Sequence, residues 1–152
     1  MEPLLGDTRL SLVRCNNAPT SEILPQSNLD PPSEIFMPPL SENSLPIEID
    51  VQSVKALIDD QADFLLIDCR EPDEHEFCRI ESAKLIPMNQ TPSRVEEFES
   101  HQDSQIVVYC HHGSRSMQVV QWLRSQGFGG AQNMTGGIEF WSQLVDSEVP
   151  RY

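Results

Sequence analysis

The sequence predicts an α/β fold of three layers, in which a central, mostly parallel β-sheet is flanked by helices. Two kinds of segment predict it. Short, continuous apolar runs at residues 64–67 and 106–109 are typical of strands that are covered on both faces. Segments with the apolar spacing of amphipathic helices alternate with these runs, and this order of elements favours parallel βαβ units.

The chain divides into two parts near residue 45. Eight of its 12 prolines lie within the first 46 of its 152 residues. Residues 1–45 show no sustained apolar period, so they cannot bury enough apolar surface to offset the chain entropy of folding. We therefore predict a disordered, proline-rich N-terminal tail at residues 1–45 and one domain at residues 46–152. The apolar cluster Ile35-Phe36-Met37 in the tail is interpreted as a contact with the domain surface, with a partner-docking motif as the alternative.

In the first half of the domain, Asp50 is the clearest helix start. It is a preferred N-cap residue, and apolar residues from Val51 to Ile58 follow it at the spacing of one helix face. The polar segment 68–72, which ends in a proline, closes the strand at residues 64–67. The further elements expected here are short strands at 47–49 and 84–87 and a helical turn or two at 94–99.

In the second half of the domain, a helix follows the strand at residues 106–109. An apolar stripe runs along it from Met117 to Leu123, and Gly127 supplies its end. The remaining elements expected here are a strand at 131–134 and a final helix that Gly136-Gly137 opens.

The composition excludes several classes of partner. The chain has 24 acidic and 10 basic residues, for a net charge of −14, which rules against nonspecific nucleic-acid binding and disfavours an anionic membrane surface. No apolar run is long enough to span a membrane, and the first residues do not resemble a signal peptide, so we expect a cytoplasmic protein. The spacing of its four cysteines matches no zinc pattern, so we expect free thiols, no metal and no cofactor.

The segment that joins the strand at residues 106–109 to the next helix carries the chemistry. Cys110 lies at the carboxyl end of a predicted parallel strand, where open α/β folds bind their ligands. The first turn of the following helix has free backbone N–H groups and a partial positive charge, which bind anions and favour a thiolate. Gly113 lets the backbone bend so that amides point inward, and Arg115 adds a planar cation that suits oxyanions. The loop is therefore predicted to hold a nucleophilic sulfur in an anion cradle.

The other residues of this loop are candidates for substrate binding. Ser114 and Ser116 have hydroxyl groups that can donate hydrogen bonds. His111 and His112 are expected to supply backbone amides and shape the mouth of the loop, with proton transfer as the alternative. Cys110 is the candidate catalytic residue, and the candidate substrate-binding residues are His111, His112, Gly113, Ser114, Arg115 and Ser116.

Three motifs, in this order, resemble the rhodanese-type sulfurtransferase family over residues 46–152. The segment Asp68-Cys69-Arg70-Glu71-Pro72 is similar to its Asp-x-Arg-Glu signature. The segment Cys110-His111-His112-Gly113-Ser114-Arg115-Ser116 is similar to its active-site loop, Cys-x-x-Gly-x-Arg-Ser. The segment Gly136-Gly137-Ile138-Glu139-Phe140-Trp141 is similar to its Gly-Gly-x-x-x-Trp motif.

The resemblance implies a single-domain enzyme with the rhodanese-like fold. Cys110 would take sulfur from a small-molecule donor such as thiosulfate as a persulfide, and an acceptor such as cyanide or a thiol, a protein thiol included, would remove it. One stretch departs from the family, because Arg79 and Ser82 stand where the family's His-Ile-x-Gly-Ala has histidine and glycine. We expect altered packing at that turn rather than lost activity.

Four residues outside the loop are also singled out. Asp68 and Arg70 are interpreted as an ion pair or hydrogen-bonding clamp that supports the loop, with a catalytic role as the alternative. Cys69, at the end of a strand expected beside that of Cys110, is interpreted as a buried thiol. The alternative for Cys69 is attack on the persulfide, which would give an intramolecular disulfide. Cys78 is expected to be a surface or half-buried thiol.

Two rival functions stay open. An arsenate reductase or phosphatase of the same fold also uses a cysteine in an anion cradle, but its Cys-x5-Arg loop has five intervening residues. Here four residues separate Cys110 from Arg115, and the tighter loop suits a sulfur atom better than a tetrahedral phosphoryl group. A sulfur-carrier or regulatory module that hands a persulfide to one protein partner is the second rival, with the N-terminal tail as a tether.

Overall fold

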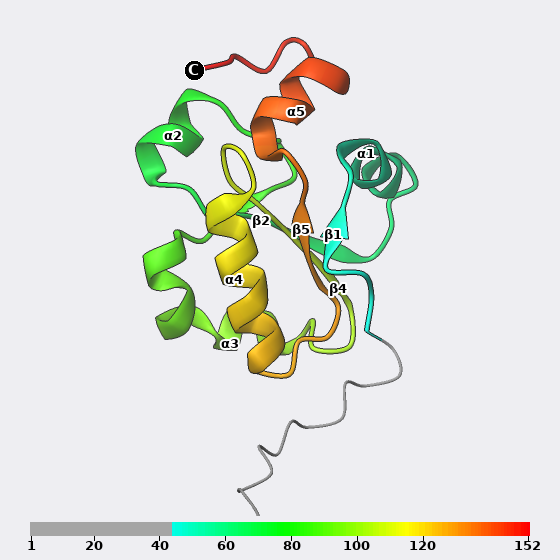
Figure 1. Ribbon diagram of the computed structural model, residues 1–152, viewed down its shortest axis with the longest axis vertical. Helices are drawn as coiled ribbons and strands as arrows, with labels where there is room; N and C mark the ends of the chain where they lie inside the picture. Colours follow the sequence, from blue (N-terminus) through cyan, green and yellow to red (C-terminus); the bar gives the residue numbers. More distant parts are fainter. Residues whose placement is uncertain (1–43) are drawn as a thin grey trace, which may run out of the picture. The chain divides into compact units, whose positions relative to one another are not determined.

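Five strands form one sheet in the order β1-β5-β4-β2-β3, and every neighbouring pair is parallel (Figure 1). The computed structural model describes residues 44–152, so the predicted tail, with Cys15 and the Ile35-Phe36-Met37 cluster, lies almost wholly outside the described residues. The predicted α/β fold with a mostly parallel sheet is confirmed, and the sheet is parallel throughout. The strands are β1 (Glu48–Ile49), β2 (Phe64–Asp68), β3 (Lys84–Leu85), β4 (Gln105–Tyr109) and β5 (Ala131–Met134).

Helices cover both faces of this sheet because successive side chains of each strand point to opposite faces. On one face, Ile67, Ile106 and Val108 pack in a cluster with residues of α4 and α3. On the other face, Leu66 and Val107 pack with residues of α1 and α5. The helical elements are α1 (Val51–Asp59), α2 (Pro72–Phe77), the 3₁₀ helix η1 (Met88–Arg94), α3 (Glu96–Glu99), α4 (Ser114–Ser125) and α5 (Gly137–Leu144).

Most predicted elements are present, and the sequence analysis missed α2 and η1. Asp50 caps α1 as predicted, since its carboxylate accepts a hydrogen bond from the backbone N–H of Ser53 at 2.8 Å. Pro72 begins α2 instead of only closing β2. A proline suits the first helical position because a backbone N–H there would have no partner within the helix. Glu71 and Glu74 form a reciprocal capping box around it, and this pattern signals a helix start.

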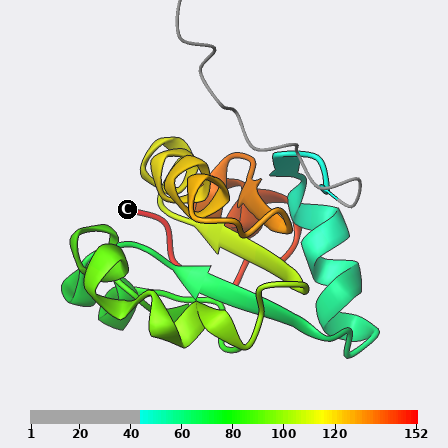
Figure 2. The same ribbon diagram turned by 90° about the horizontal axis from the view of Figure 1, so that it is seen from below.

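The parallel topology brings two polar segments together at one edge of the sheet. The strands β2 and β4 lie side by side in register, with Asp68 opposite Tyr109 (Figure 2). Both strands end at this edge, so the next residues, Cys69 and Cys110, are neighbours. Cys78 is also buried, only 5% exposed, although a position near the surface was expected. It packs in the cluster on the opposite face of the sheet from Cys69 and Cys110. Within residues 44–152, no helix has both the length and the apolar character to cross a membrane.

Candidate active site

Cys110 lies at the start of a tight loop between β4 and α4. Gly113 has a φ of 101°, a left-handed conformation that glycine adopts without strain, and it is followed directly by the first residue of α4. The backbone N–H of Gly113 donates a hydrogen bond to Cys110 Sγ at 3.1 Å. The loop thus folds back on the sulfur, and Cys110 is only 1% exposed.

The groups around Cys110 favour its thiolate. A hydrogen bond from the Cys69 thiol contributes most, followed by the hydroxyl and backbone N–H of Ser116 and the backbone N–H of Gly113. Together they lower the pKa of Cys110 to about 4, although burial acts in the opposite direction. At neutral pH the side chain is therefore a thiolate, which is the nucleophilic form of cysteine.

The hydroxyl of Ser116 is shared between two partners. It lies 2.6 Å from Oδ1 of Asn133, on the neighbouring strand β5, and 3.4 Å from Cys110 Sγ. A hydroxyl has one proton, and the shorter contact is to Asn133. Asn133 therefore holds Ser116 beside the sulfur. The Ser116 hydroxyl is shared between Asn133 and the thiolate, so it stabilises the thiolate only in part.

The N-terminus of α5 packs directly on the carbonyl side of the loop. The backbone N–H groups of Ile138 and Glu139 donate to the carbonyl oxygens of Cys110 and His111, at 2.9 and 3.1 Å. Gly137 has a φ of 59°, and a Cβ atom there would lie 2.3 Å from the Cys110 carbonyl oxygen. Gly137 is therefore needed because no side chain fits between α5 and the loop, whereas a Cβ at Gly136 would instead meet the side chain of Phe140.

Arg115 faces the loop but pairs with α2. Its two terminal nitrogens each donate to one carboxylate oxygen of Glu74, both at 2.7 Å. This bidentate pair lowers the pKa of Glu74 to about 2 and raises the pKa of Arg115. The negative charge of Cys110 also raises the pKa of Arg115, so the guanidinium lies within electrostatic reach of the nucleophile.

A second ion pair is connected to Arg115 through Tyr152. Asp68 and Arg70 are both fully buried and pair at 2.6 and 2.9 Å. Arg70 also donates to the Tyr152 hydroxyl at 2.9 Å, and that hydroxyl donates to Glu74 at 2.7 Å. The chain of polar contacts therefore runs from the end of β2, through Tyr152 and α2, to the loop.

The two loop histidines stack on each other and on Tyr152. The ring centroids of His111 and His112 are 3.9 Å apart, and those of His111 and Tyr152 are 4.2 Å apart. Burial is the main cause that lowers the pKa of His111, and the neighbouring His112 lowers it further. His111 is therefore neutral at neutral pH. His112 is exposed and forms the outer surface of the loop.

The structure places the predicted site residues in two groups. Gly113 and Ser116 contact the sulfur directly, whereas Ser114 is exposed at the first position of α4. Asp68 and Arg70 pair with each other and reach the loop only through other side chains.

Three residues of this site were missed by the sequence analysis. The Pro72 helix start could have placed Glu74, and a buried asparagine inside an apolar strand could have marked Asn133. No sequence signal connects Tyr152 to the loop, because 40 residues lie between it and His111 and only the tertiary fold brings the two together.

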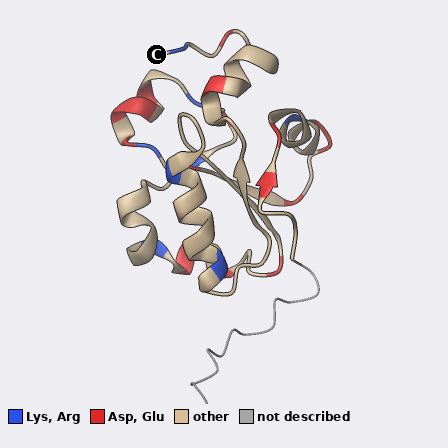
Figure 3. Ribbon diagram, in the orientation of Figure 1, with Lys and Arg blue, Asp and Glu red and all other residues tan. Residues whose placement is uncertain are grey.

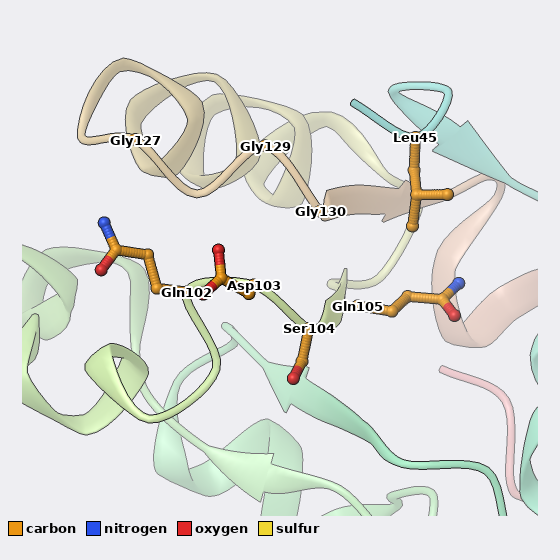
Figure 4. A pocket seen from close by; sticks show the side chains of 8 residues that line it. All are labelled: Leu45, Gln102, Asp103, Ser104, Gln105, Gly127, Gly129 and Gly130. Carbon is orange, nitrogen blue, oxygen red and sulfur yellow. The ribbon is translucent and has the colours of Figure 1, made fainter. Parts of the chain in front are cut away.

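Acidic residues lie on both helices beside the loop, and the pocket at the opposite edge of the sheet is not part of the site. Figure 3 shows acidic residues on α2 and α5, the helices on either side of the loop. A pocket of about 330 Å³ lies instead at the opposite edge of the sheet, where β4 and β5 begin (Figure 4). It contains no nucleophilic cysteine. Among residues 44–152, no three His, Cys, Asp or Glu side chains are grouped so that they could hold a metal ion.

Comparisons with known proteins agree on one family. A sequence model described as "Rhodanese-like domain" matches residues 50–144. Rhodanese-like/PpiC domain-containing protein 12, chloroplastic, of Arabidopsis thaliana is 36% identical over 118 residues, which are 74% of this chain and 40% of that protein. A protein named sulfurtransferase from Allochromatium vinosum is 38% identical over 96 residues, which are 63% of this chain and 88% of that protein.

A solved structure gives the same result. The crystal structure of a rhodanese-like domain protein from Staphylococcus aureus aligns with a TM-score of 0.60 and 26% identity, covering 70% of this chain and 99% of that chain. This chain therefore spans less than half of the Arabidopsis protein but nearly all of the two bacterial ones.

Proposed function

Because the chain belongs to the rhodanese-like domain family, we propose that it is a sulfurtransferase that moves sulfane sulfur through a persulfide on Cys110. The observation that supports this most is the setting of the sulfur. Cys110 Sγ is a buried thiolate at the N-terminal end of α4, with hydrogen bonds from Gly113 and Ser116. Group transfer through a cysteine requires a nucleophilic thiolate whose negative charge is stabilised by hydrogen-bond donors that are already in place before the reaction.

In the first half of the reaction, the Cys110 thiolate attacks the sulfane sulfur of a donor such as thiosulfate. A new S–S bond forms to Cys110, the S–S bond of thiosulfate breaks, and sulfite leaves with the electron pair. The outer persulfide sulfur then carries the negative charge. The loop amides and the positive end of the α4 dipole, which stabilised the thiolate, stabilise this charge next to the same position.

In the second half, an acceptor nucleophile attacks the outer sulfur. Cyanide leaves as thiocyanate, and a thiol leaves as a persulfide of its own. In either case Cys110 departs as the thiolate, which its low pKa makes a good leaving group. The protein's residues hold the sulfur and the charge throughout, and this route includes no cofactor or metal.

A protein persulfide is the second candidate donor, and the state of Arg115 favours it. A dianion such as thiosulfate gains most from an unpaired cation, whereas both terminal nitrogens of Arg115 already bind Glu74. A partner protein that presents a persulfide brings less charge and can displace His112 at the loop mouth. This donor corresponds to the sulfur-carrier alternative in the sequence analysis. The cytoplasmic location also stays a prediction.

The rival phosphatase or arsenate reductase gains no support from the geometry of the loop. Its N–H groups converge on Sγ itself, with Gly113 N only 3.1 Å from the sulfur. A phosphoryl group needs the amides to surround three oxygens beyond the sulfur, which a longer loop provides.

Intact mass spectrometry after incubation with thiosulfate tests the proposed function. One sulfur, about 32 Da, should add to the chain, and cyanide should remove it with thiocyanate as the product. Cys110→Ser should form neither the adduct nor thiocyanate, because a hydroxyl does not ionise near neutral pH.

Cys78→Ser is the matched control, since Cys78 is also buried but lies on the other face of the sheet. It should keep both the adduct and the turnover. A Cys110→Ser chain that still acquired cyanide-removable sulfur at the wild-type rate would disprove the role of Cys110. Turnover with a protein persulfide but not with thiosulfate would select the carrier function.

A further inference from the structure

Cys69 lies next to the candidate nucleophile, whose pKa it lowers, and it has no covalent role in the transfer route described above. The register that pairs Asp68 with Tyr109 continues to Cys69 and Cys110, and Cys69 N–H donates to the Tyr109 carbonyl oxygen at 3.0 Å. Both side chains belong to the same hydrophobic cluster and each residue is 1% exposed. The two cysteines therefore lie side by side on one face of the sheet.

This arrangement suits a disulfide bond. Neighbouring strands are about 4.8 Å apart, and disulfides join residues whose Cα atoms are about 4.4–6.8 Å apart. Both cysteines are free thiols, and the neighbouring Cys69 thiol is the main cause that lowers the pKa of Cys110. The register of the two strands therefore already places the two side chains beside each other.

We propose that Cys69 is an internal resolving thiol: when no acceptor reaches the persulfide on Cys110, Cys69 displaces its outer sulfur as sulfide, and the two cysteines form a disulfide. The inference rests on the proposed function, because that persulfide is the species on which Cys69 acts. It gives the site a second product, sulfide, besides the transferred sulfur.

The step balances without an external oxidant. A bond forms between the sulfurs of Cys69 and Cys110, and the bond from Cys110 to the outer sulfur breaks. The proton of the Cys69 thiol goes to the departing sulfur, which leaves as HS⁻. The outer sulfur is reduced to sulfide, and the two cysteine sulfurs are oxidised to the disulfide, so the persulfide itself supplies the oxidising equivalents.

The environment of Cys69 makes this step slow relative to transfer. The hydrogen bond to Cys110 and burial raise the pKa of Cys69, so its thiolate is rare at neutral pH. A mobile acceptor with a lower pKa therefore reacts first when it is present. In its absence the persulfide converts to a disulfide, which a thiol reductant opens to restore Cys110.

The lifetime of the isolated persulfide tests this inference. The wild-type chain, Cys69→Ser and Cys78→Ser are loaded with thiosulfate, desalted, and followed by intact mass and by sulfide release without an acceptor. In the wild type and in Cys78→Ser, the adduct of about 32 Da should give way to a species about 2 Da lighter than the starting chain, with one sulfide per disulfide. Peptide mapping without reductant should find Cys69 joined to Cys110.

The Cys69→Ser chain should keep its adduct at least tenfold longer and never form the lighter species. Cys69→Ala repeats the measurement without a buried hydroxyl, and thermal unfolding shows that each variant is folded. Decay of the adduct at the wild-type rate in folded Cys69 variants, or decay of the wild type without the lighter species, would overturn the inference. Absence of any adduct in all chains would instead overturn the proposed function, and the resolving step with it.

Discussion

Cys69 and Cys110 occupy equivalent positions after two neighbouring strands, yet their thiols behave in opposite ways. Each residue is 1% exposed, and both lie in one hydrophobic cluster. The pKa of Cys110 is lowered to about 4, while the pKa of Cys69 is raised. Burial acts against the charged form of both, so burial does not explain the difference.

The interaction between the two thiols is the largest cause of both shifts, lowering the pKa of Cys110 and raising that of Cys69, and the residues that follow each cysteine decide which of the two ionises. After Cys110 the chain turns through Gly113 into α4, and backbone N–H groups point at the sulfur. After Cys69 the chain continues through Arg70, whose side chain goes to Asp68, and through a proline that has no N–H to offer. A strand end places a thiol near the ligand edge of the sheet, but the donors of the next loop decide whether it ionises.

The largest effect is expected from lengthening the loop, which should make Cys110 resemble Cys69. A glycine inserted between Gly113 and Ser114 moves the amides away from the sulfur. The pKa of Cys110 should rise, and thiosulfate turnover should fall about a hundredfold or more, as when a preorganised donor site is lost. Thiolate absorbance against pH and steady-state kinetics measure the two changes.

A glycine inserted between Gln102 and Asp103, in an exposed turn at the opposite edge of the sheet, is the control and should leave both quantities unchanged. Full turnover in the lengthened loop would mean that loop length does not select the chemistry.

The next effect is expected from Arg115, which has no counterpart beside Cys69. Arg115→Ala should lower kcat/KM for thiosulfate about tenfold to a hundredfold, since it removes the cation within electrostatic reach of Cys110 and the charge-assisted hydrogen bonds to Glu74, which contribute about 1.5–3 kcal/mol. Arg115→Lys should recover only part of it, because an ammonium group cannot bind both oxygens of Glu74. Arg94→Ala is the control, as Arg94 pairs with Glu97 away from the site. Near-normal kinetics in Arg115→Ala would refute the role.

The same pair predicts a pH effect on stability. Arg115 holds the pKa of Glu74 at about 2, below its ordinary 4.5, so the pair stabilises the fold above pH 4.5 and is lost as the pH falls towards 2. As the pH falls from 4.5 to 2, the free energy of unfolding of Glu74→Gln should therefore decrease less than that of the wild type. The difference should be roughly 1 kcal/mol, because the pair is partly exposed. Urea unfolding at several pH values measures it, and parallel curves would contradict the assignment.

A smaller effect is expected from Ser116, because its hydroxyl is shared with Asn133. Ser116→Ala should raise the pKa of Cys110 and slow sulfur transfer roughly threefold to tenfold, less than for a full charge-assisted hydrogen bond because the single proton of Ser116 is shared with Asn133. At pH 5 the wild type should be mostly thiolate and the variant less so. Ser142→Ala, which removes a buried serine of α5, is the control. An unchanged pKa in Ser116→Ala would show that backbone amides alone ionise the sulfur.

The smallest effect is expected from removing the predicted tail. Cys69 and Cys110 both lie in the domain at residues 46–152. A chain that begins at Leu45 should therefore keep the catalytic rate and the melting temperature. A chain that begins at Ile47 is the matched control, because it lacks the carbonyl oxygens of Leu45 and Pro46 that bind Arg124. It should melt roughly 5 °C lower. A large loss of rate or stability in the longer chain would sink the two-part division.

The loop could be predicted from the sequence because its chemistry is local. Cys110, Gly113 and the start of α4 lie within a few residues, and helix termini and glycine turns follow from short-range backbone physics. The alternating elements likewise predicted the parallel sheet, because side-chain periodicity is written in consecutive residues.

The chemistry of the site depends on contacts that no local pattern contains. Glu74 reaches Arg115 across 41 residues, and Tyr152 reaches Glu74 across 78. The sequence by itself determined most of the strands, the loop and the candidate nucleophile, since each depends on neighbouring residues. Only the tertiary structure decided that Arg115 is paired and that Cys69 lies beside Cys110, because the register of β2 against β4 and the packing of α2 on the loop are set by the whole core.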